Sequence, residues 1–177
     1  MITVVVINGA GTSGKDTFID KFSEVCYEAG REFLPYRFSS VDTIKTSAKL
    51  IGWDGVKDDK GRRLLSDLKD AMTRYNDAPF KYMENKVHVY ERLCKENNTH
   101  GFLFFHIREP QEIQKMVEKF NAVSLLVVRD SVFLDNFTNH ADKNVYDYDY
   151  DYQVFNNGTL DDLKNSAREF FKYLLEK

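Results

Sequence analysis

Short apolar runs alternate with longer stretches of helical spacing along this chain. Three runs rich in β-branched or aromatic residues are nearly continuous, at 3–7, 102–107 and 122–128. Runs of this kind are typical of strands that are covered on both faces in a parallel sheet. Two weaker runs, at 32–40 and 151–157, complete a predicted set of about five parallel strands.

Between these runs, apolar residues recur three and four positions apart, as they do on the buried face of an amphipathic helix. Four such stripes begin at Phe18, Leu64, Met83 and Leu160. Strands that alternate with helices predict an α/β fold with three layers, helices on both sides of one sheet. The sequence contains no internal repeat and no linker-like tract, so we expect a single domain over residues 1–177.

Two segments interrupt this alternation. Residues 41–98 continue the chain in helical segments after the second predicted strand, and residues 129–150 separate the last two strands. In open α/β sheets such excursions border the ligand crevice. We therefore expect 41–98 to form a helical insertion on the acceptor side, where a pocket for an acceptor substrate can form, and 129–150 to form a lid region.

Composition narrows the class of protein. The net charge is −3, so the chain lacks the basic footprint of a nucleic-acid-binding domain. Cys26 and Cys94 have neither the density of a disulfide framework nor the spacing of a zinc site. The sequence passes from Met1 into ITVVVI without a signal-peptide pattern, and no apolar stretch approaches the roughly 20 residues of a membrane span. We expect a cytoplasmic protein without nucleic-acid or membrane partners; a homodimer is compatible with the sequence.

The stretch INGAGTSGKDTF, residues 7–18, carries the strongest chemical signal. It fits G-x-x-x-x-G-K followed by Asp, between a buried strand and an amphipathic helix. Glycines let backbone amides approach phosphate oxygens, and the helix start adds its positive dipole end. A glycine turn with an incidental lysine is the alternative. The predicted nucleotide-phosphate ligands are Gly9, Gly11, Thr12, Ser13, Gly14, Lys15, Asp16 and Thr17.

Asp16 stands where the usual loop has a hydroxyl that ligates Mg²⁺ between the β- and γ-phosphates. A carboxylate is also a hard oxygen ligand and can bind the ion directly or through water. It adds negative charge beside phosphate, however, so Thr17 or water could supply the inner ligand instead. Asp16 could also merely stabilise the first helical turn. Asp16 and Thr17 are thus the candidate metal ligands.

The segment SGKDT after a strand resembles the variant phosphate loop of bacteriophage deoxynucleoside monophosphate kinases and of animal-type phosphomevalonate kinases. IREPQEI (107–113) is similar to the strand-then-Arg-x-Pro segment of the nucleotide kinases. YDYQVFNNGTLDDL (150–163) resembles the closing strand, turn and helix shared with dephospho-coenzyme A kinase. The resemblance implies a P-loop NTPase fold, ATP and Mg²⁺ as cofactors, and a small phosphorylated acceptor.

Candidate acceptor residues lie in the excursion after the second strand. Asp42 stands where related kinases often carry an Asp that orients or deprotonates the acceptor, and Lys45 follows one turn later. Helix capping is the alternative role for Asp42. Arg62 and Arg63 precede an amphipathic stripe and could bind an acceptor phosphate bidentately, or could simply open a solvated helix.

Arg108 and Arg129 each follow a buried strand, at the carboxyl edge where ligands of open sheets bind. Ordinary surface arginines are the alternative. By resemblance, Arg108 would meet the acceptor nucleotide and Arg129 would belong to the lid. Related kinases place an Asp two residues before Arg108 to help hold Mg²⁺ through water, and His106 stands there instead. An imidazole is a poor Mg²⁺ ligand, so either Asp16 takes over the metal or activity is reduced. His106 could also have no role in the chemistry.

These observations leave three functions open. The first is ATP-dependent phosphoryl transfer to a nucleoside monophosphate, with a deoxynucleotide as one option. The second is a kinase of another small metabolite, of the dephospho-coenzyme A or phosphomevalonate type, and the third is a non-catalytic ATP-binding regulatory protein. The predicted catalytic set is Lys15, Asp42, Arg63, Arg108 and Arg129.

Overall fold

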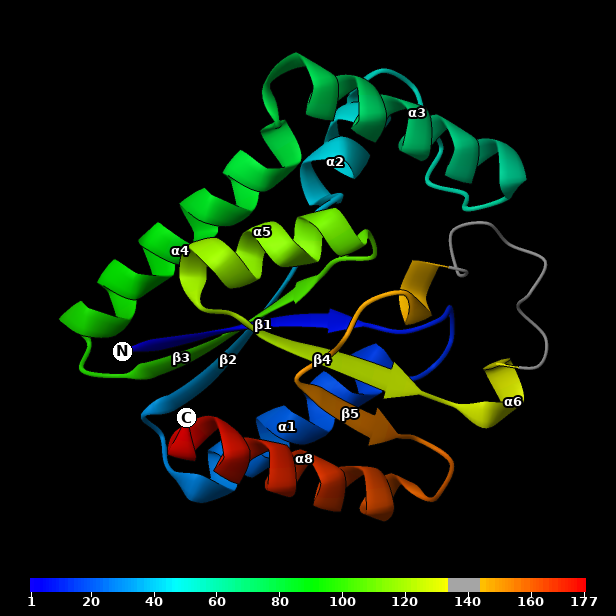
Figure 1. Cartoon of the computed structure of the whole chain (residues 1–177). Helices are drawn as coiled ribbons and strands as arrows, with labels where there is room; N and C mark the ends of the chain where they lie inside the picture. Colours follow the sequence, from blue (N-terminus) through cyan, green and yellow to red (C-terminus); the bar gives the residue numbers. More distant parts are fainter. Residues whose placement is uncertain (134–143) are drawn as a thin grey trace.

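The computed structural model describes residues 1–133 and 144–177. Within these residues one sheet of parallel strands forms, in the order β2-β3-β1-β4-β5 (Figure 1). The strands are β1 (Ile2–Asn8), β2 (Phe33–Ser39), β3 (His100–His106), β4 (Val123–Val128) and β5 (Tyr152–Phe155). All five strands predicted from the apolar runs are thereby confirmed.

Helices cover both faces of this sheet, which confirms the α/β class and its three layers. Helices α1 and α8 lie on one face and α4 and α5 on the other, with α2 and α3 farther out on the α4–α5 side (Figure 1). The helices described are α1 (Lys15–Ala29), α2 (Asp42–Leu50), α3 (Asp59–Asn76), α4 (Ala78–Glu96), α5 (Pro110–Phe120), α6 (Asp130–Phe133), the 3₁₀ helix η1 (Asn144–Tyr146) and α8 (Leu160–Glu176).

Alternate residues of the strands point to opposite faces of the sheet and pack into two separate hydrophobic cores. Val5 and Ile7 of β1 face α1 and α8, whereas Val4 and Val6 face α4 and α5. Phe22 of α1 packs edge-on against two rings of β3 with centroid distances of 5.1 and 5.0 Å. Because both faces are covered, the strands read as continuous apolar runs rather than alternating ones.

The insertion over 41–98 consists of α2, α3 and α4, of which α4 packs directly on the sheet through Met83 and Val87. The apolar stripe of α3 has the predicted helical spacing but is not a core stripe. Leu64 is 39% exposed and Tyr75 is 79% exposed. The reason is that α4 and α5 already cover this face of the sheet. None of the helices in residues 1–133 and 144–177 is long and apolar enough to span a bilayer.

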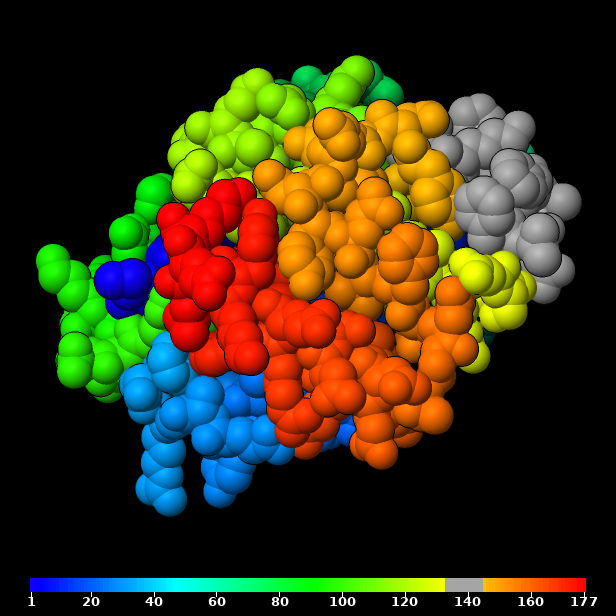
Figure 2. Space-filling model, turned by 60° about the horizontal axis from the view of Figure 1, so that its bottom comes forward, coloured from blue at the N-terminus to red at the C-terminus, as the bar shows by residue number. Residues whose placement is uncertain are grey.

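The loop after β5 is fixed by the start of α8. The Thr159 hydroxyl accepts a hydrogen bond from the Asp162 amide, and the Asp162 carboxylate accepts one from the Thr159 amide at 2.8 Å. This capping box satisfies two amides at the helix start. Figure 2 shows α8 (orange to red) together with the segment that leads into β5 across this face of the molecule.

The connections around β1 leave the sheet in opposite directions. The chain passes from β1 into α1 on one face, and from the neighbouring strand β3 into α5 on the other. Such a switch opens a crevice at the carboxyl ends of the strands, where open α/β sheets bind ligands. The glycine-rich loop lies at this edge.

Candidate active site

The loop between β1 and α1 has a backbone that requires glycine at two positions. Gly9 has φ +150°, and a Cβ there would overlap the Val127 carbonyl oxygen. Gly14 has φ +95°, and a Cβ there would overlap the Asn156 side-chain amide. Both glycines therefore serve a left-handed backbone and a close approach of chain segments. This geometry fits the phosphate-loop prediction.

Lys15 reaches back across the loop. Its Nζ lies 2.7 Å from both the Gly9 and the Ala10 carbonyl oxygens. Helix α1 begins at Lys15, and no side chain caps it. Several backbone amides of this loop, among them those of Gly11, Thr12, Gly14 and Asp16, have no acceptor in the described part of the chain. Donors, a cation and a helix dipole thus converge at one place, which is an anion-binding arrangement.

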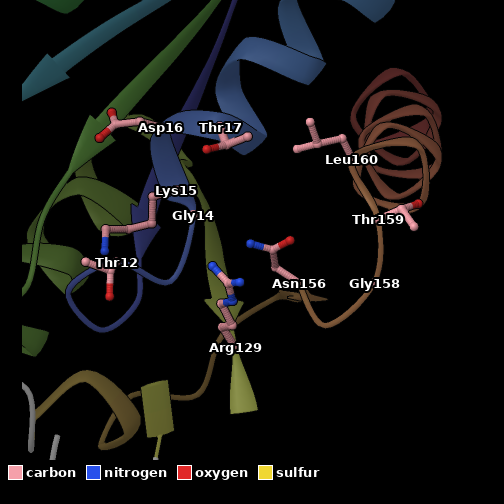
Figure 3. A pocket seen from close by; sticks show the side chains of 10 residues that line it. All are labelled: Thr12, Gly14, Lys15, Asp16, Thr17, Arg129, Asn156, Gly158, Thr159 and Leu160. Carbon is pink, nitrogen blue, oxygen red and sulfur yellow. The ribbon is translucent and has the colours of Figure 1, made fainter. Parts of the chain in front are cut away.

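A pocket of about 560 Å³ opens beside the loop. Its volume falls within the range of small-molecule sites. Figure 3 shows the loop on one side, Thr159 and Leu160 on the other, and Arg129 and Asn156 between them. The lining residues are Thr12, Gly14, Lys15, Asp16, Thr17, Arg129, Asn156, Gly158, Thr159 and Leu160. Arg129, which the sequence placed in a lid, therefore lies in the pocket of the phosphate loop.

Two asparagines that the sequence analysis did not select hold the far wall of this pocket. The Asn156 amide donates to the Ser13 carbonyl at 2.9 Å. The Asn157 side chain accepts from the Asp130 amide at 2.9 Å and donates to the Asp130 carboxylate at 2.8 Å. These bonds tie the loop after β5 to the phosphate loop and to the residue after Arg129. Their signal in the sequence is the Asn-Asn-Gly turn after the last strand.

Asn8, the last residue of β1, holds the start of the glycine-rich loop in place through its side chain. The Asn8 side chain accepts from the Gly9 amide at 2.8 Å and donates to the Tyr150 hydroxyl at 2.7 Å. Tyr150 is buried, which raises the pKa of its hydroxyl, and it donates to the Val145 carbonyl. Val145 and Tyr150 belong to the α4–α5 core, so the end of the expected lid segment 129–150 is core structure. Its middle, 134–143, lies outside the described residues.

Asp16, on the first turn of α1, is paired with an arginine from β2. Its Oδ1 accepts a hydrogen bond from Arg37 Nη1 at 2.8 Å, and Arg37 Nη2 donates to Asp20 Oδ1 at 2.6 Å. Burial by itself would raise the pKa of Asp16, but the Arg37 hydrogen bond and nearby positive charges outweigh burial and lower it. Sequence reasoning missed Arg37, because the sequence of a strand does not show which residue of a helix its side chains contact.

His106, at the end of β3, lies against the same carboxylate. Its Nε2 is 3.5 Å from Asp16 Oδ1, yet it is buried and has no hydrogen-bond partner within the described residues. Burial lowers the pKa of His106 to about 4, with the Asp16 charge opposing this shift. The imidazole is therefore neutral at pH 7, and the 3.5 Å contact is not an ion pair there.

The largely buried His106 imidazole predicts that acid lowers the stability of the fold. An unfolded His titrates near pH 6.5 and His106 near pH 4, so the unfolded state binds more protons between these values. We expect the free energy of unfolding to fall by up to about 3 kcal/mol between pH 6.5 and 4, relative to His106→Gln. Denaturant unfolding of both proteins across this range measures the difference. Parallel profiles for the two proteins would contradict it.

Asp42 and Lys45 lie together at the start of α2, on the acceptor side. Asp42 Oδ2 accepts from the Ser39 amide at 2.8 Å, and its Oδ1 lies 3.5 Å from Lys45 Nζ. No side chain caps α2, so the alternative of helix capping by Asp42 is wrong. Instead, Asp42 braces the turn that follows β2.

The other predicted acceptor residues are spread over the surface above the sheet edge. Arg62 and Arg63 are exposed on the first turn of α3, which Asp58 caps by accepting from the Gly61 amide at 2.7 Å. Arg108 is exposed just after β3. Asp42, Lys45 and these three arginines do not line the pocket beside the phosphate loop. Their joint role as an acceptor site stays a prediction.

The residues present fit Mg²⁺ as an ion bound mainly by phosphate. Within the described ranges no group of three or more His, Cys, Asp or Glu side chains could hold a metal by itself. Mg²⁺ commonly uses only one or two carboxylates, with phosphate and water oxygens as the remaining ligands. Asp16 keeps its second carboxylate oxygen outside the Arg37 hydrogen bond, and Thr17 also lines the pocket.

Comparisons with known proteins give little beyond this geometry. No protein-family model matches the sequence, and no curated protein matches it. Among solved structures, the chain is similar to an unliganded sugar kinase from Janibacter sp. HTCC2649, with 10% sequence identity and a TM-score of 0.44. The match covers 99% of this chain and 95% of that chain. A likeness of this degree assigns neither a substrate nor a mechanism.

Proposed function

We propose that this protein transfers a phosphoryl group from ATP to a small phosphorylated acceptor, a nucleoside monophosphate. The observation that carries the proposal is the phosphate loop: Lys15, free loop amides and the uncapped start of α1 converge on one pocket. The pocket of about 560 Å³ extends from the loop to Arg129, Asn156 and residues 158–160, which leaves room for a base and sugar.

Each part of the loop has a role in this proposal. The amides and Lys15 hold the ATP phosphates, and Lys15 exchanges its two carbonyl partners for phosphate oxygens when ATP binds. Asp16 or Thr17 would hold Mg²⁺, which supplies charge neutralisation between the β- and γ-phosphates when bound. Arg129 contributes a second positive charge to the same pocket.

The proposed acceptor side needs charge rather than a strong base. A monophosphate oxygen is already nucleophilic, so catalysis depends on positioning and on neutralising the two phosphates. Arg62, Arg63, Arg108 and Lys45 are the candidates for this task. Asp42, fixed by the Ser39 amide, would orient the acceptor.

The substitution Asp42→Asn separates this proposal from a kinase with a hydroxyl acceptor. Asn retains an oxygen that can accept from the Ser39 amide but cannot act as a base. With a monophosphate acceptor we expect kcat to fall less than about tenfold, because no base is required. Loss of about a thousandfold with unchanged ATP affinity would favour a hydroxyl acceptor, as in another metabolite kinase.

The direct test is ADP release from ATP and Mg²⁺ with each common ribo- and deoxynucleoside monophosphate in turn. Release that one acceptor stimulates, and that Lys15→Ala abolishes, would support the proposal and name the substrate. ATP binding without stimulation by any monophosphate would contradict it.

A non-catalytic ATP-binding protein is the second candidate, and one observation favours it. The neutral His106 stands where a metal-supporting carboxylate is expected. If the wild type binds ATP without turnover and His106→Asp gains turnover at unchanged ATP affinity, this candidate is correct. Normal turnover in the unmutated protein would exclude it.

A further inference from the structure

The carboxylate of Asp16 poses an electrostatic problem for a phosphate site. It belongs to the first turn of α1 directly after Lys15 and lines the same pocket. Triphosphate is strongly anionic, so an uncompensated carboxylate at this distance would oppose its binding. Binding at this loop therefore calls for a cation that faces Asp16.

Strand alternation brings such a cation to the right face of the sheet. Tyr36 and Phe38 of β2 point into the α4–α5 core, so Arg37 between them points toward α1. There its two terminal nitrogens bind Asp16 and Asp20, at 2.8 and 2.6 Å. In Figure 3 the Asp16 side chain points away from Leu160.

The two-point attachment fixes the guanidinium. Asp16 and Asp20 are four residues apart, so they are neighbours on one helix face. The Arg37 side chain is 39% exposed, and its two hydrogen bonds raise its pKa although burial acts to lower it. An arginine held in this way keeps its charge and its position beside the first turn of α1.

Other positive or polar groups near Asp16 do not replace this arginine. The Nε2 of His106 lies 3.5 Å from Asp16 Oδ1 and makes no hydrogen bond within the described residues. The Nζ of Lys15 is hydrogen-bonded to loop carbonyls on the side where phosphate would bind. Within the described chain, the cation in hydrogen-bond contact with Asp16 is Arg37.

We propose that Arg37 is a positioning residue of the phosphate site, which cancels the charge of Asp16 and thereby lets a carboxylate remain in a triphosphate-binding loop. This inference rests on the proposed function, since it assumes that the loop binds a triphosphate. Asp20 contributes by holding the second nitrogen of Arg37. Removing Arg37 exposes the triphosphate to the full charge of Asp16, whereas removing both charges relieves the repulsion.

A double-mutant cycle tests this inference without turnover or metal. ATP and inorganic tripolyphosphate are titrated by calorimetry, in the presence of EDTA, into the wild type, Arg37→Met, Asp16→Asn and the double variant. We expect Arg37→Met to bind both anions about tenfold more weakly, in line with one uncompensated charge near the site. Asp16→Asn should bind at least as tightly as the wild type, and the double variant should return to within about twofold of it. The deficit of Arg37→Met should shrink at about 0.5 M salt.

Arg168→Met is the matched control. Arg168 also pairs with a carboxylate of α1, its Nη2 lying 3.0 Å from Glu28 Oε2, and it is 44% exposed. Glu28 is twelve residues beyond Asp16, about 18 Å along the helix. That separation exceeds the Debye length of about 10 Å at 0.1 M salt, so this variant should bind both anions like the wild type.

The outcomes are distinct. Wild-type affinity in Arg37→Met overturns the inference. Weak binding that Asp16→Asn does not rescue also overturns it, because Arg37 would then act only through the fold. A wild type that binds both anions and shows the rescue, but releases no ADP with any monophosphate, leaves the inference standing and contradicts the proposed transfer. A wild type that binds neither anion contradicts both.

Discussion

Lys15→Ala is expected to lower acceptor-dependent ADP release by about a thousandfold, the largest effect of any single side chain in the site. The lysine is the cation that lies within the phosphate loop, and its Nζ is 2.7 Å from the carbonyls of Gly9 and Ala10. In the proposed transfer the charge of the moving phosphate would lie at this position, where no other side chain of the loop supplies a cation. Initial rates of ADP formation with the best acceptor, at saturating ATP, measure the loss.

Two further measurements make this prediction specific. The free energy of unfolding should change by no more than about 1 kcal/mol, because water can replace the ammonium at two partly buried carbonyls. Lys21→Ala is the control, since Lys21 lies on the same helix and pairs with Glu24 at 2.6 Å. Its rate should equal that of the wild type. If Lys15→Ala keeps the wild-type rate, the phosphate loop is not the site of phosphoryl transfer.

The strands and main helices could be predicted because both signals are local. A strand covered on two faces must be apolar along its length, as the runs in β1, β3 and β4 are. A helix is likewise recognised from apolar residues that recur three and four positions apart. What such a stripe packs against is not local. The stripe on α3 reads like that of α4, yet α4 takes the place on the sheet and leaves Leu64 and Tyr75 exposed.

The glycine-rich loop was also accessible to sequence reasoning, since the spacing of its glycines and lysine is contained in residues 9–15. Gly9 and Gly14 have the positive φ angles that glycine adopts readily, and the Lys15 side chain folds back to the Gly9 carbonyl. The surroundings of the loop come from remote segments. Arg37 reaches Asp16 from β2, and Asn156 reaches Ser13 from the end of β5, across sequence separations of 21 and 143 residues. No spacing rule in a single sequence encodes such pairs.

Arg108 and Arg129 show how much can be predicted from charged residues that follow buried strands. The expectation that charges following buried strands gather at the carboxyl edge holds for Arg129, which lines the pocket. The same expectation does not show which ligand each arginine would contact. Arg108 follows β3 and Arg129 follows β4, and these two strands lie on opposite sides of β1. The resemblance assigned Arg129 to a lid, whereas the structure places it beside Asn156 in the pocket next to the glycine-rich loop.

Gly9→Ala is expected to have the largest effect on stability. A methyl group at this position would overlap the backbone carbonyl of Val127, and the residue has φ +150°. Neither obstacle is a flexible side chain that can swing aside, because β4 holds Val127 between β1 and β5. We expect a loss of about 3 kcal/mol from strain and overlap together. For a chain of 177 residues this corresponds to a melting temperature about 10 °C lower.

Gly11→Ala is the matched control for stability, since a Cβ at Gly11 meets no atom within 4 Å and its backbone is not left-handed. Its melting temperature should stay within about 2 °C of the wild type. Calorimetric scans of the three proteins, with and without ATP, complete the test. ATP should raise the melting temperature of the wild type but not that of Gly9→Ala, because a displaced loop cannot present its amides to phosphate. Equal melting temperatures for Gly9→Ala and Gly11→Ala would mean that β1 and β4 do not hold the loop in this conformation, and the phosphate site would then lack its rigid base.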